Sequence, residues 1–285
     1  MTDPHPSDVP SIADWNRLLA GKVAVVTGGG VGIGGAIARL FAEHGAHVEI
    51  GEIDAERGAQ AERDIRAAGG SATARVVDVR DTTAVAAYAN DVLARNQHVD
   101  VLVNNVGDYR PLVRFPHSTP ESWQAMSDIN LTHVFAVTQA FIGTMIAQHA
   151  GSIVNVHSVE GMRGYPGDPV YGAMKAAVAH FTTCLAVTVG RNGIRVNGIG
   201  PDLTQTPQVD YITGSEAHTD LWPSWAPVGR LGWPEDQARV ALFLASDAAA
   251  FVTGHNIPVD GGSKAGGGWF FSPAAARFVN RPTGL

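Results

Sequence analysis

The chain of 285 residues contains one cysteine, Cys184, so an internal disulfide is excluded. Because Cys184 lies in the apolar run "HFTTCLAVTV", we expect a buried and unreactive thiol. A protein without disulfides suits a reducing compartment, and a cytoplasmic location is expected. The N-terminus lacks the basic start and apolar stretch of a signal peptide. No run of about 20 apolar residues predicts a membrane span, so a soluble protein is expected.

Long blocks of like charge are also missing. The formal net charge is −7, and charged residues make up only 16% of the chain. Nucleic acid and anionic membranes are therefore not expected as partners. The apolar fraction of 45% is typical of a soluble globular protein. No metal site is predicted.

Short runs rich in valine and isoleucine alternate with longer helical patterns along the chain. The predicted strands are 22–28, 47–52, 73–79, 100–107, 151–158, 194–200 and 255–262. Their centres hardly alternate in polarity, which is typical of parallel strands covered on both faces. Strand followed by helix throughout predicts an α/β fold with a doubly wound parallel sheet of seven strands. Since no linker divides the chain, we expect one domain over 21–262, an N-terminal extension over 1–20 and a C-terminal tail over 263–285.

The first predicted strand runs into the glycine-rich turn "TGGGVGIGGAIA", Thr27 to Ala38. Glycines let a backbone turn sharply and approach a pyrophosphate, and the following helix N-terminus favours that charge. The pattern G-x-G-x-x-G fits at Gly30, Gly32 and Gly35, but other registers fit as well. An acidic residue about 20 positions later binds ribose hydroxyls in such folds. Glu52 and Asp54 both qualify by spacing.

A second constellation is Tyr171 and Lys175, four residues apart, with Ser158 thirteen residues before the tyrosine. Residues four apart share one face of a helix. A lysine ammonium beside a phenol lowers the pKa of the phenol from about 10, so Tyr171 is a candidate acid or base near neutral pH. By itself such a pair is also common on ordinary exposed helices.

These features together resemble the short-chain dehydrogenase/reductase family, in its compact single-domain branch with a Rossmann fold. The resemblance covers about Gly21 to Gly262. Its Thr-Gly-x-x-x-Gly-x-Gly turn falls on Thr27, Gly28, Gly32, Ile33 and Gly34, and its second-strand acid on Glu52. Asp54 then becomes a solvated neighbour. The other positions that the resemblance assigns to the cofactor are Asp78, Val79, Asn105, Val106, Gly107, Pro201 and Thr206, with Tyr171 and Lys175.

The resemblance implies hydride transfer between an alcohol carbon and a nicotinamide cofactor. The implied catalytic residues are Asn130, Ser158, Tyr171 and Lys175. Tyr171 would exchange the proton of the substrate hydroxyl, Ser158 would bind the substrate oxygen, and Lys175 would lower the pKa of Tyr171 and hold the nicotinamide ribose. Asn130 would anchor a water that leads protons away from Lys175.

The expected cofactor is NAD, because the Glu52 carboxylate would accept hydrogen bonds from the ribose and repel the 2′-phosphate of NADP. Val31 and Ile53 occupy the positions where family members that prefer NADP tend to carry a basic residue. Arg57 is the nearest cation and is expected along the following helix.

Two departures from the family pattern bear on the substrate. Asp202 replaces the usual glycine after the sixth strand, where we expect it to cap the next turn. In "HSVEG", His157 is expected to be structural, whereas Glu160 either faces the substrate or is a solvated loop acid. Segment 203–229 is predicted to cover the substrate.

The aromatic residues of that segment, Tyr211, Trp222 and Trp225, and Tyr165 upstream either line the pocket or pack on the core. If they line it, the substrate is an apolar, cyclic or aryl alcohol or ketone. A reductase of acyl-carrier-protein substrates is an alternative, which the uncharged Ile129 and Gly172 make less favourable. A catalytically silent dinucleotide-binding regulator is the other alternative function.

The helices expected over 121–149 and 171–190 are apolar on more than one face, which favours a homotetramer. The tail contains "GGGWFF", and we expect its aromatic residues to dock at a subunit interface or a neighbouring site mouth.

Overall fold

The computed structural model describes residues 12–209, 226–267, 270–272 and 277–279. Seven parallel strands form one sheet in the order β3-β2-β1-β4-β5-β6-β7. The strands are β1 (Val23–Thr27), β2 (His47–Glu52), β3 (Ser71–Val76), β4 (Val101–Asn104), β5 (Gly151–Val156), β6 (Ile194–Pro201) and β7 (Asn256–Val259). The predicted doubly wound parallel sheet is confirmed.

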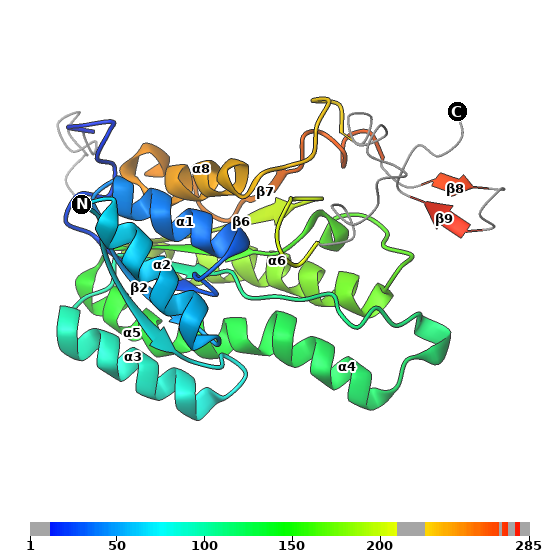
Figure 1. The fold of residues 1–285 in the computed structure, drawn as a ribbon, viewed down its shortest axis with the longest axis horizontal. Helices are drawn as coiled ribbons and strands as arrows, with labels where there is room; N and C mark the ends of the chain where they lie inside the picture. The colour runs from blue at the N-terminus through cyan, green and yellow to red at the C-terminus, as the bar shows by residue number, and fades with distance from the viewer. Residues whose placement is uncertain (1–11, 210–225, 268–269, 273–276, 280–285) are drawn as a thin grey trace.

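Helices cover both faces of the sheet (Figure 1). One face carries α1 (Gly32–Glu43), α2 (Ala55–Ala67) and α8 (Pro234–Ala245), and the other α3 (Thr82–Asn96), α5 (His133–Gln148) and α6 (Pro169–Val189). Side chains of β1 alternate between the two layers: Ala24 and Val26 pack with α1 and α8, while Val23 and Val25 pack on the other side. Because both sides are covered, every residue of β1 is buried, which explains its continuous apolar run.

The strand order places the functional edge of the sheet. The chain proceeds from β1 to β2 on one side of β1 and later to β4 on its other side. Ligands of doubly wound sheets bind at such a switch point, outside the carboxyl ends of the strands. Here these ends are Thr27 and Asn104.

The long helix expected over 121–149 has three parts. It begins with α4 (Pro120–Ser127), continues through a π-helical turn over Asp128–Thr132 and ends with α5. Thr119 caps α4 by accepting a hydrogen bond from the backbone of Ser122. The π turn contains Asn130, and such turns often mark functional sites in helices.

Two sequence-based expectations need correction at this level. The predicted third strand, 73–79, is shifted, because β3 spans Ser71–Val76 and the chain leaves the sheet at Val77. Cys184 is exposed rather than buried, with Sγ 3.5 Å from the Nε2 atom of His180. In α6 the buried positions include Val178, Thr182 and Ala186, so Cys184 lies on the opposite face.

The helical runs Pro120–Gln148 and Pro169–Asn192 are long and apolar enough to cross a membrane by length and composition, each with a mean hydropathy of 1.3. This corrects the expectation that no run reaches that length. Core helices of soluble proteins pass the same test, and both runs flank the sheet here. Their outer faces expose large apolar side chains, among them Phe135 and Val187.

Part of the tail forms a two-stranded antiparallel ladder between β8 (Phe270–Ser272) and β9 (Arg277–Val279). Tyr211, Trp222, Trp225 and Trp269 lie outside the described residues. Their predicted roles, and the docking of the tail, stay predictions.

Candidate active site

A cavity of about 1580 Å³ opens at the carboxyl ends of the strands. Most residues predicted from the sequence line it: Gly28, Gly32, Ile33, Glu52, Asp78, Val79, Asn105, Val106, Gly107, Ser158, Tyr171, Lys175, Pro201 and Thr206. Thr27, Gly34 and Asn130 are not part of the lining, and their contacts place them directly behind it. The fold therefore brings the two constellations of the sequence into one site.

The backbone of the glycine turn requires glycine at Gly28, Gly32 and Gly34. Gly28 and Gly32 have φ angles of +64° and +59°, which favour glycine. A Cβ atom on Gly34 would lie 2.2 Å from the carbonyl oxygen of Gly28. Asn105 fixes this turn to β4, because its side-chain amide donates to the carbonyl oxygens of Thr27 (3.0 Å) and Gly28 (3.3 Å). Among the glycine registers that fit the sequence, the structure therefore favours the one with Gly28, Gly32 and Gly34, because these positions do not tolerate a side chain.

The N-terminus of α1 faces the cavity and suits an anion. Val31 at its N-cap makes no side-chain capping bond, and its first turn contains no acidic residue. Val31, Gly32 and Ile33 line the cavity, and the first backbone N–H groups of a helix have no partner within the helix. Uncapped N–H groups together with the helix dipole favour a phosphate. These features fit the pyrophosphate of a dinucleotide.

Glu52 lies at the end of β2 with only 7% of its surface exposed. Its Oε2 atom accepts a hydrogen bond from the Gly30 N–H at 3.1 Å, and Oε1 accepts from Ile53 (3.0 Å) and Asp54 (3.3 Å). The carboxylate is therefore held rigidly, and Oε2 keeps capacity for a further donor such as a ribose hydroxyl. Asp54 instead caps α2 by accepting from Glu56 and Arg57.

Arg57 lies on α2, as expected, but it also lines the cavity. Its side chain is 56% exposed and its Nε atom lies 3.6 Å from Asp54. Asp78 on the adjoining wall accepts three side-chain hydrogen bonds from Arg80, at 2.9 Å, 3.2 Å and 2.7 Å. The Arg80 guanidinium lowers the pKa of Asp78, so the carboxylate is ionised. Two arginines thus border this end of the cavity.

Tyr171 and Lys175 lie on the first turns of α6 and share one helix face. Asp168 begins this helix: its carboxylate accepts hydrogen bonds from the backbone N–H groups of Val170 (3.0 Å) and Tyr171 (3.1 Å). Ser158 lies two residues after the end of the buried strand β5, and its Oγ atom accepts from the Glu160 N–H at 3.1 Å. Ser158 and Tyr171 line the same cavity, and the Ser158 side chain lowers the pKa of the phenol.

Lys175 is 3% exposed and donates to the carbonyl oxygen of Val156 at 3.5 Å. Gly107 packs against it, because a Cβ atom there would lie 2.4 Å from Nζ of Lys175 and 3.0 Å from Oδ1 of Asn130. Asn130 is fully buried and clamps the backbone of Asp108, accepting from its N–H (3.1 Å) and donating to its carbonyl oxygen (2.7 Å). Its side chain holds the loop after β4; its predicted water stays a prediction.

The pKa of Tyr171 differs from expectation. Burial raises it above its ordinary value of 10, and the Ser158 hydrogen bond opposes this only in part. Burial lowers the pKa of Lys175 to about 8. Lys175 therefore loses its charge before a tyrosine of higher pKa ionises, so in this structure it does not bring the phenol below its ordinary value. The expected activation of Tyr171 by Lys175 stays a prediction.

Replacing Lys175 with methionine is expected to stabilise the protein at neutral pH. A fall in pKa from 10.5 to about 8 corresponds to about 3 kcal/mol of unfavourable burial of the cation. The cost is complete below about pH 8 and disappears as pH rises toward 10.5, because the unfolded chain then binds more protons. Urea unfolding at pH 7 and pH 10 measures the difference. Lys22→Met, at a side chain 41% exposed, is the control; equal stability of Lys175→Met and wild type at pH 7 would contradict the assignment.

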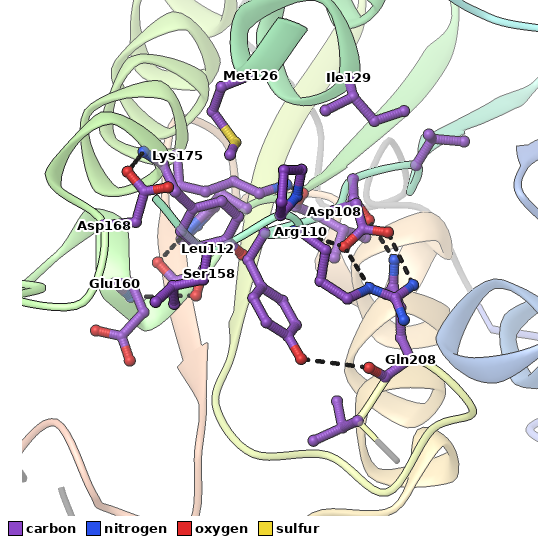
Figure 2. Close-up of a pocket in the computed structure, with 18 of the residues that line it drawn as sticks. Asp108, Arg110, Leu112, Met126, Ile129, Ser158, Glu160, Asp168, Lys175 and Gln208 are labelled. Atoms are coloured by element: carbon purple, nitrogen blue, oxygen red, sulfur yellow. Dashed lines mark hydrogen bonds and ion pairs between the residues drawn. The ribbon is translucent and has the colours of Figure 1, made fainter. Parts of the chain in front are cut away.

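Aromatic and apolar side chains surround the phenol on the other side of the cavity. The rings of Tyr165 and Tyr109 lie edge-on to that of Tyr171, with centroids 5.8 Å and 6.5 Å away. Figure 2 shows Ser158, Glu160 and Lys175 on one side of the pocket, and Asp108, Arg110 and Gln208 on the other. Leu112, Met126 and Ile129 also line it. Apolar and aromatic side chains therefore line part of the cavity that holds the phenol.

On the side of the pocket opposite Glu160, Figure 2 shows the charged side chains of Asp108 and Arg110, which form an ion pair. Arg110 donates to both carboxylate oxygens of Asp108, at 3.1 Å and 2.9 Å. Burial raises the pKa of Asp108, but the bonds from Arg110 outweigh it and keep the carboxylate ionised. Gln208 joins the segment after β6 to this wall by donating to the Gly107 carbonyl oxygen at 2.9 Å.

At the two departures from the family pattern, the structure overturns the expected cap at Asp202, excludes the solvated alternative for Glu160 and agrees with the structural role of His157. Asp202 does not cap a turn: its carboxylate pairs with Arg163 at 3.3 Å and accepts a short hydrogen bond from Ser263. Glu160 is not a solvated acid, since its side chain is 11% exposed and pairs with Arg163 at 2.9 Å. His157 is buried against Gly198 and Gly200, and burial lowers its pKa to about 4. This neutral ring fits the structural role expected.

Two buried residues of the site were missed from the sequence. Asp168 orients Tyr171, and its signal was the "DP" pair that often starts a helix. His133 begins α5 three residues after Asn130 and is 1% exposed. Burial and the charge of Lys175 lower its pKa to about 3, so the ring is neutral at physiological pH. Nothing in the sequence marks a single histidine in an apolar helix as a buried residue near Lys175.

The sequence is similar to those of known proteins. A family model described as enoyl-(acyl carrier protein) reductase matches residues 28–264. A 3-oxoacyl-[acyl-carrier-protein] reductase of Chlamydia muridarum is 41% identical over 87% of this chain and 99% of its own length. The chain belongs to the short-chain dehydrogenase/reductase family.

Two further family members bear on the substrate. A cis-4-hydroxycyclohexanecarboxylate dehydrogenase of Sinomonas cyclohexanicum is 40% identical over 86% of this chain and 98% of its own. The solved structure of a 7α-hydroxysteroid dehydrogenase with NADH and 7-oxo glycochenodeoxycholic acid has a TM-score of 0.82 at 31% identity, covering 88% of this chain and 98% of that one. The chain is thus a short-chain dehydrogenase/reductase oxidoreductase, and this family binds a nicotinamide dinucleotide.

Proposed function

We propose that this protein is an NAD(H)-dependent oxidoreductase that interconverts a secondary alcohol and a ketone on an apolar or cyclic substrate. The observation that carries the proposal is the meeting of Ser158, Tyr171 and Lys175 in the cavity that also holds the glycine turn. The turn and the α1 N-terminus suit a pyrophosphate, and the phenol lies beside the apolar half of the same cavity.

The bound cofactor would supply or accept the hydride. Tyr171 accepts the hydroxyl proton in alcohol oxidation and donates one in ketone reduction. Ser158 holds the substrate oxygen next to the phenol, since both side chains line the same cavity. Lys175, in its charged form, favours the phenolate and holds the nicotinamide ribose. Asn130 keeps the loop carrying Gly107 against Lys175.

A cyclic substrate is supported by the apolar wall and by the relatives. Leu112, Met126, Ile129 and Tyr165 border the phenol region, and Arg110 there is paired with Asp108. The names of two relatives record a cyclohexane hydroxy acid and a steroid. A ring alcohol fits such a wall better than a strongly charged substrate does.

A second candidate is reduction of 3-oxoacyl thioesters carried by acyl carrier protein. The Chlamydia relative favours it, as does Arg114, which is exposed and lines the cavity. Ile129 and Gly172 beside the catalytic positions are uncharged and weaken it. A silent dinucleotide-binding regulator is the third, less favoured because Ser158, Tyr171, Lys175 and Asn130 are all present.

The deciding experiment is a turnover panel with both NAD(H) and NADP(H). We expect cyclic secondary alcohols or ketones to be converted faster than acetoacetyl thioesters, measured by nicotinamide absorbance. Preference for the thioester would favour the carrier-protein reductase. Binding of NADH by fluorescence without turnover of any compound would favour the regulator.

We further propose a soluble, cytoplasmic homotetramer without nucleic-acid or membrane partners. Support comes from the apolar outer faces of α5 and α6, where Phe135 packs on Phe181 with centroids 4.8 Å apart and Val187 is 82% exposed. Such faces are typical of subunit interfaces. Light scattering at micromolar concentration is expected to give four chain masses. A monomer at that concentration would refute the proposal.

A further inference from the structure

Three charged side chains meet beside the Ser158 loop. Arg163 is 9% exposed at its side chain, Glu160 11% and Asp202 6%. The guanidinium donates to both oxygens of Glu160, at 2.9 Å and 3.2 Å, and from Nη2 to both oxygens of Asp202, at 3.3 Å. Breaking such a buried pair leaves a charge uncompensated, which is strongly unfavourable.

This group of three, the Arg163 triad, connects three parts of the site. Glu160 donates its backbone N–H to Oγ of Ser158, and Ser158 donates to the Pro201 carbonyl oxygen at 3.4 Å. Asp202 directly follows Pro201 and accepts from the hydroxyl of Ser263, beyond β7. The loop after β5, the end of β6 and the segment after β7 are thus held by one buried ion network.

Glu160 connects the triad electrostatically to the phenol, because its charge raises the pKa of Tyr171. Two carboxylates and one guanidinium leave one net negative charge. Other titratable and charged groups also lie around Tyr171. They are Lys175, Asp108 (which is paired with Arg110), Tyr109, Tyr165, Ser158 and Asp168, the N-cap residue of α6. Burial first and then the charge of Glu160 raise the pKa of Tyr171.

We propose that Arg163 is a positioning residue with two effects. By holding Glu160 and Asp202, it keeps Ser158 against Tyr171. By pairing with both carboxylates, it also keeps their negative charge from acting fully on the phenol. The proposal rests on the proposed function. It assigns to Asp202, which replaces the glycine usual in the family, an electrostatic role in the acid–base step.

The test compares charge changes of opposite sign. Arg163→Met removes the cation and is expected to raise the apparent pKa in the pH profile of alcohol oxidation by about one unit, while Glu160→Gln removes an anion and is expected to lower it by a similar amount. For Arg163→Met, kcat should fall roughly tenfold to a hundredfold with little change in KM for the cofactor, and Arg163→Lys should restore part of it. A purely structural role predicts no such opposite shifts.

Two further measurements keep the outcome clear. Nuclear magnetic resonance of ¹³Cζ-labelled tyrosine, with Tyr171 assigned by its missing signal in Tyr171→Phe, orders the phenol pKa values without any turnover. Arg63→Met, on an exposed pair with Glu56, is the matched control and should change nothing. If Arg163→Met does not fold, Glu160→Gln and Asp202→Asn test the proposal instead, because an amide has nearly the same size and shape as the carboxylate that it replaces.

The proposal is overturned if Glu160→Gln and Asp202→Asn leave the Tyr171 titration unchanged or raise it. Absence of turnover in the wild type would refute the proposed function instead, and the resonance titration would still decide on the triad.

Discussion

Tyr171→Phe is expected to lower kcat about 10² to 10⁴-fold, the usual contribution of general acid–base catalysis. The change removes one oxygen and keeps the ring, so its packing against Tyr165 and Tyr109 should persist. Binding of NADH should be close to that of the wild type, because the glycine turn and Glu52 are untouched. Stopped-flow absorbance and NADH fluorescence titration measure the two quantities separately.

Tyr88→Phe is the matched control, since Tyr88 lies on α3, its hydroxyl donates to the Glu49 carbonyl oxygen of β2, and it does not line the cavity. Its kcat should stay near the wild-type value. If Tyr171→Phe retains more than about a tenth of wild-type kcat, another group moves the proton and the proposed mechanism is wrong.

NAD is expected to be preferred over NADP by several hundredfold in kcat/KM. The Glu52 carboxylate, fixed by three backbone N–H groups, would lie against the 2′-phosphate of NADP. Like charges at about 4 Å repel by roughly 4 kcal/mol at an effective dielectric near 20. Glu52→Ala should remove most of this preference. The ratio of kcat/KM for the two cofactors, on one alcohol that is turned over, is the measurement.

Arg57 makes this test sharper. It lines the same end of the cavity, and it is exposed and only loosely paired with Asp54. In the Glu52→Ala background Arg57 is expected to attract the phosphate and turn the preference toward NADP. Adding Arg57→Met should cancel that gain. An unchanged ratio in Glu52→Ala would show that the carboxylate does not contact the ribose.

The fold followed from the sequence because local pattern and burial agree. The runs that became β1, β4 and β5 have centres rich in valine, leucine and isoleucine without regular alternation, since each strand is covered by helices on both faces. Strand order also placed Thr27, Asn105 and Ser158 at one edge, because carboxyl ends of parallel strands meet there. β3 is less regular: it pairs with β2 alone and is partly exposed, so its apolar pattern did not mark its bounds.

The sequence by itself determined which residues form the candidate site: the glycine turn, Glu52, and the set of Ser158, Tyr171 and Lys175 carry spacings that the fold converts into proximity. Only the tertiary structure decided how those groups are charged and supported. Burial raises the pKa of Tyr171 and lowers that of Lys175, which no spacing reveals. The pairing of Asp202 with Arg163 joins residues 39 positions apart, and the side of α6 that exposes Cys184 depends on what packs against the helix. Desolvation and long-range contact exist only once the chain is folded.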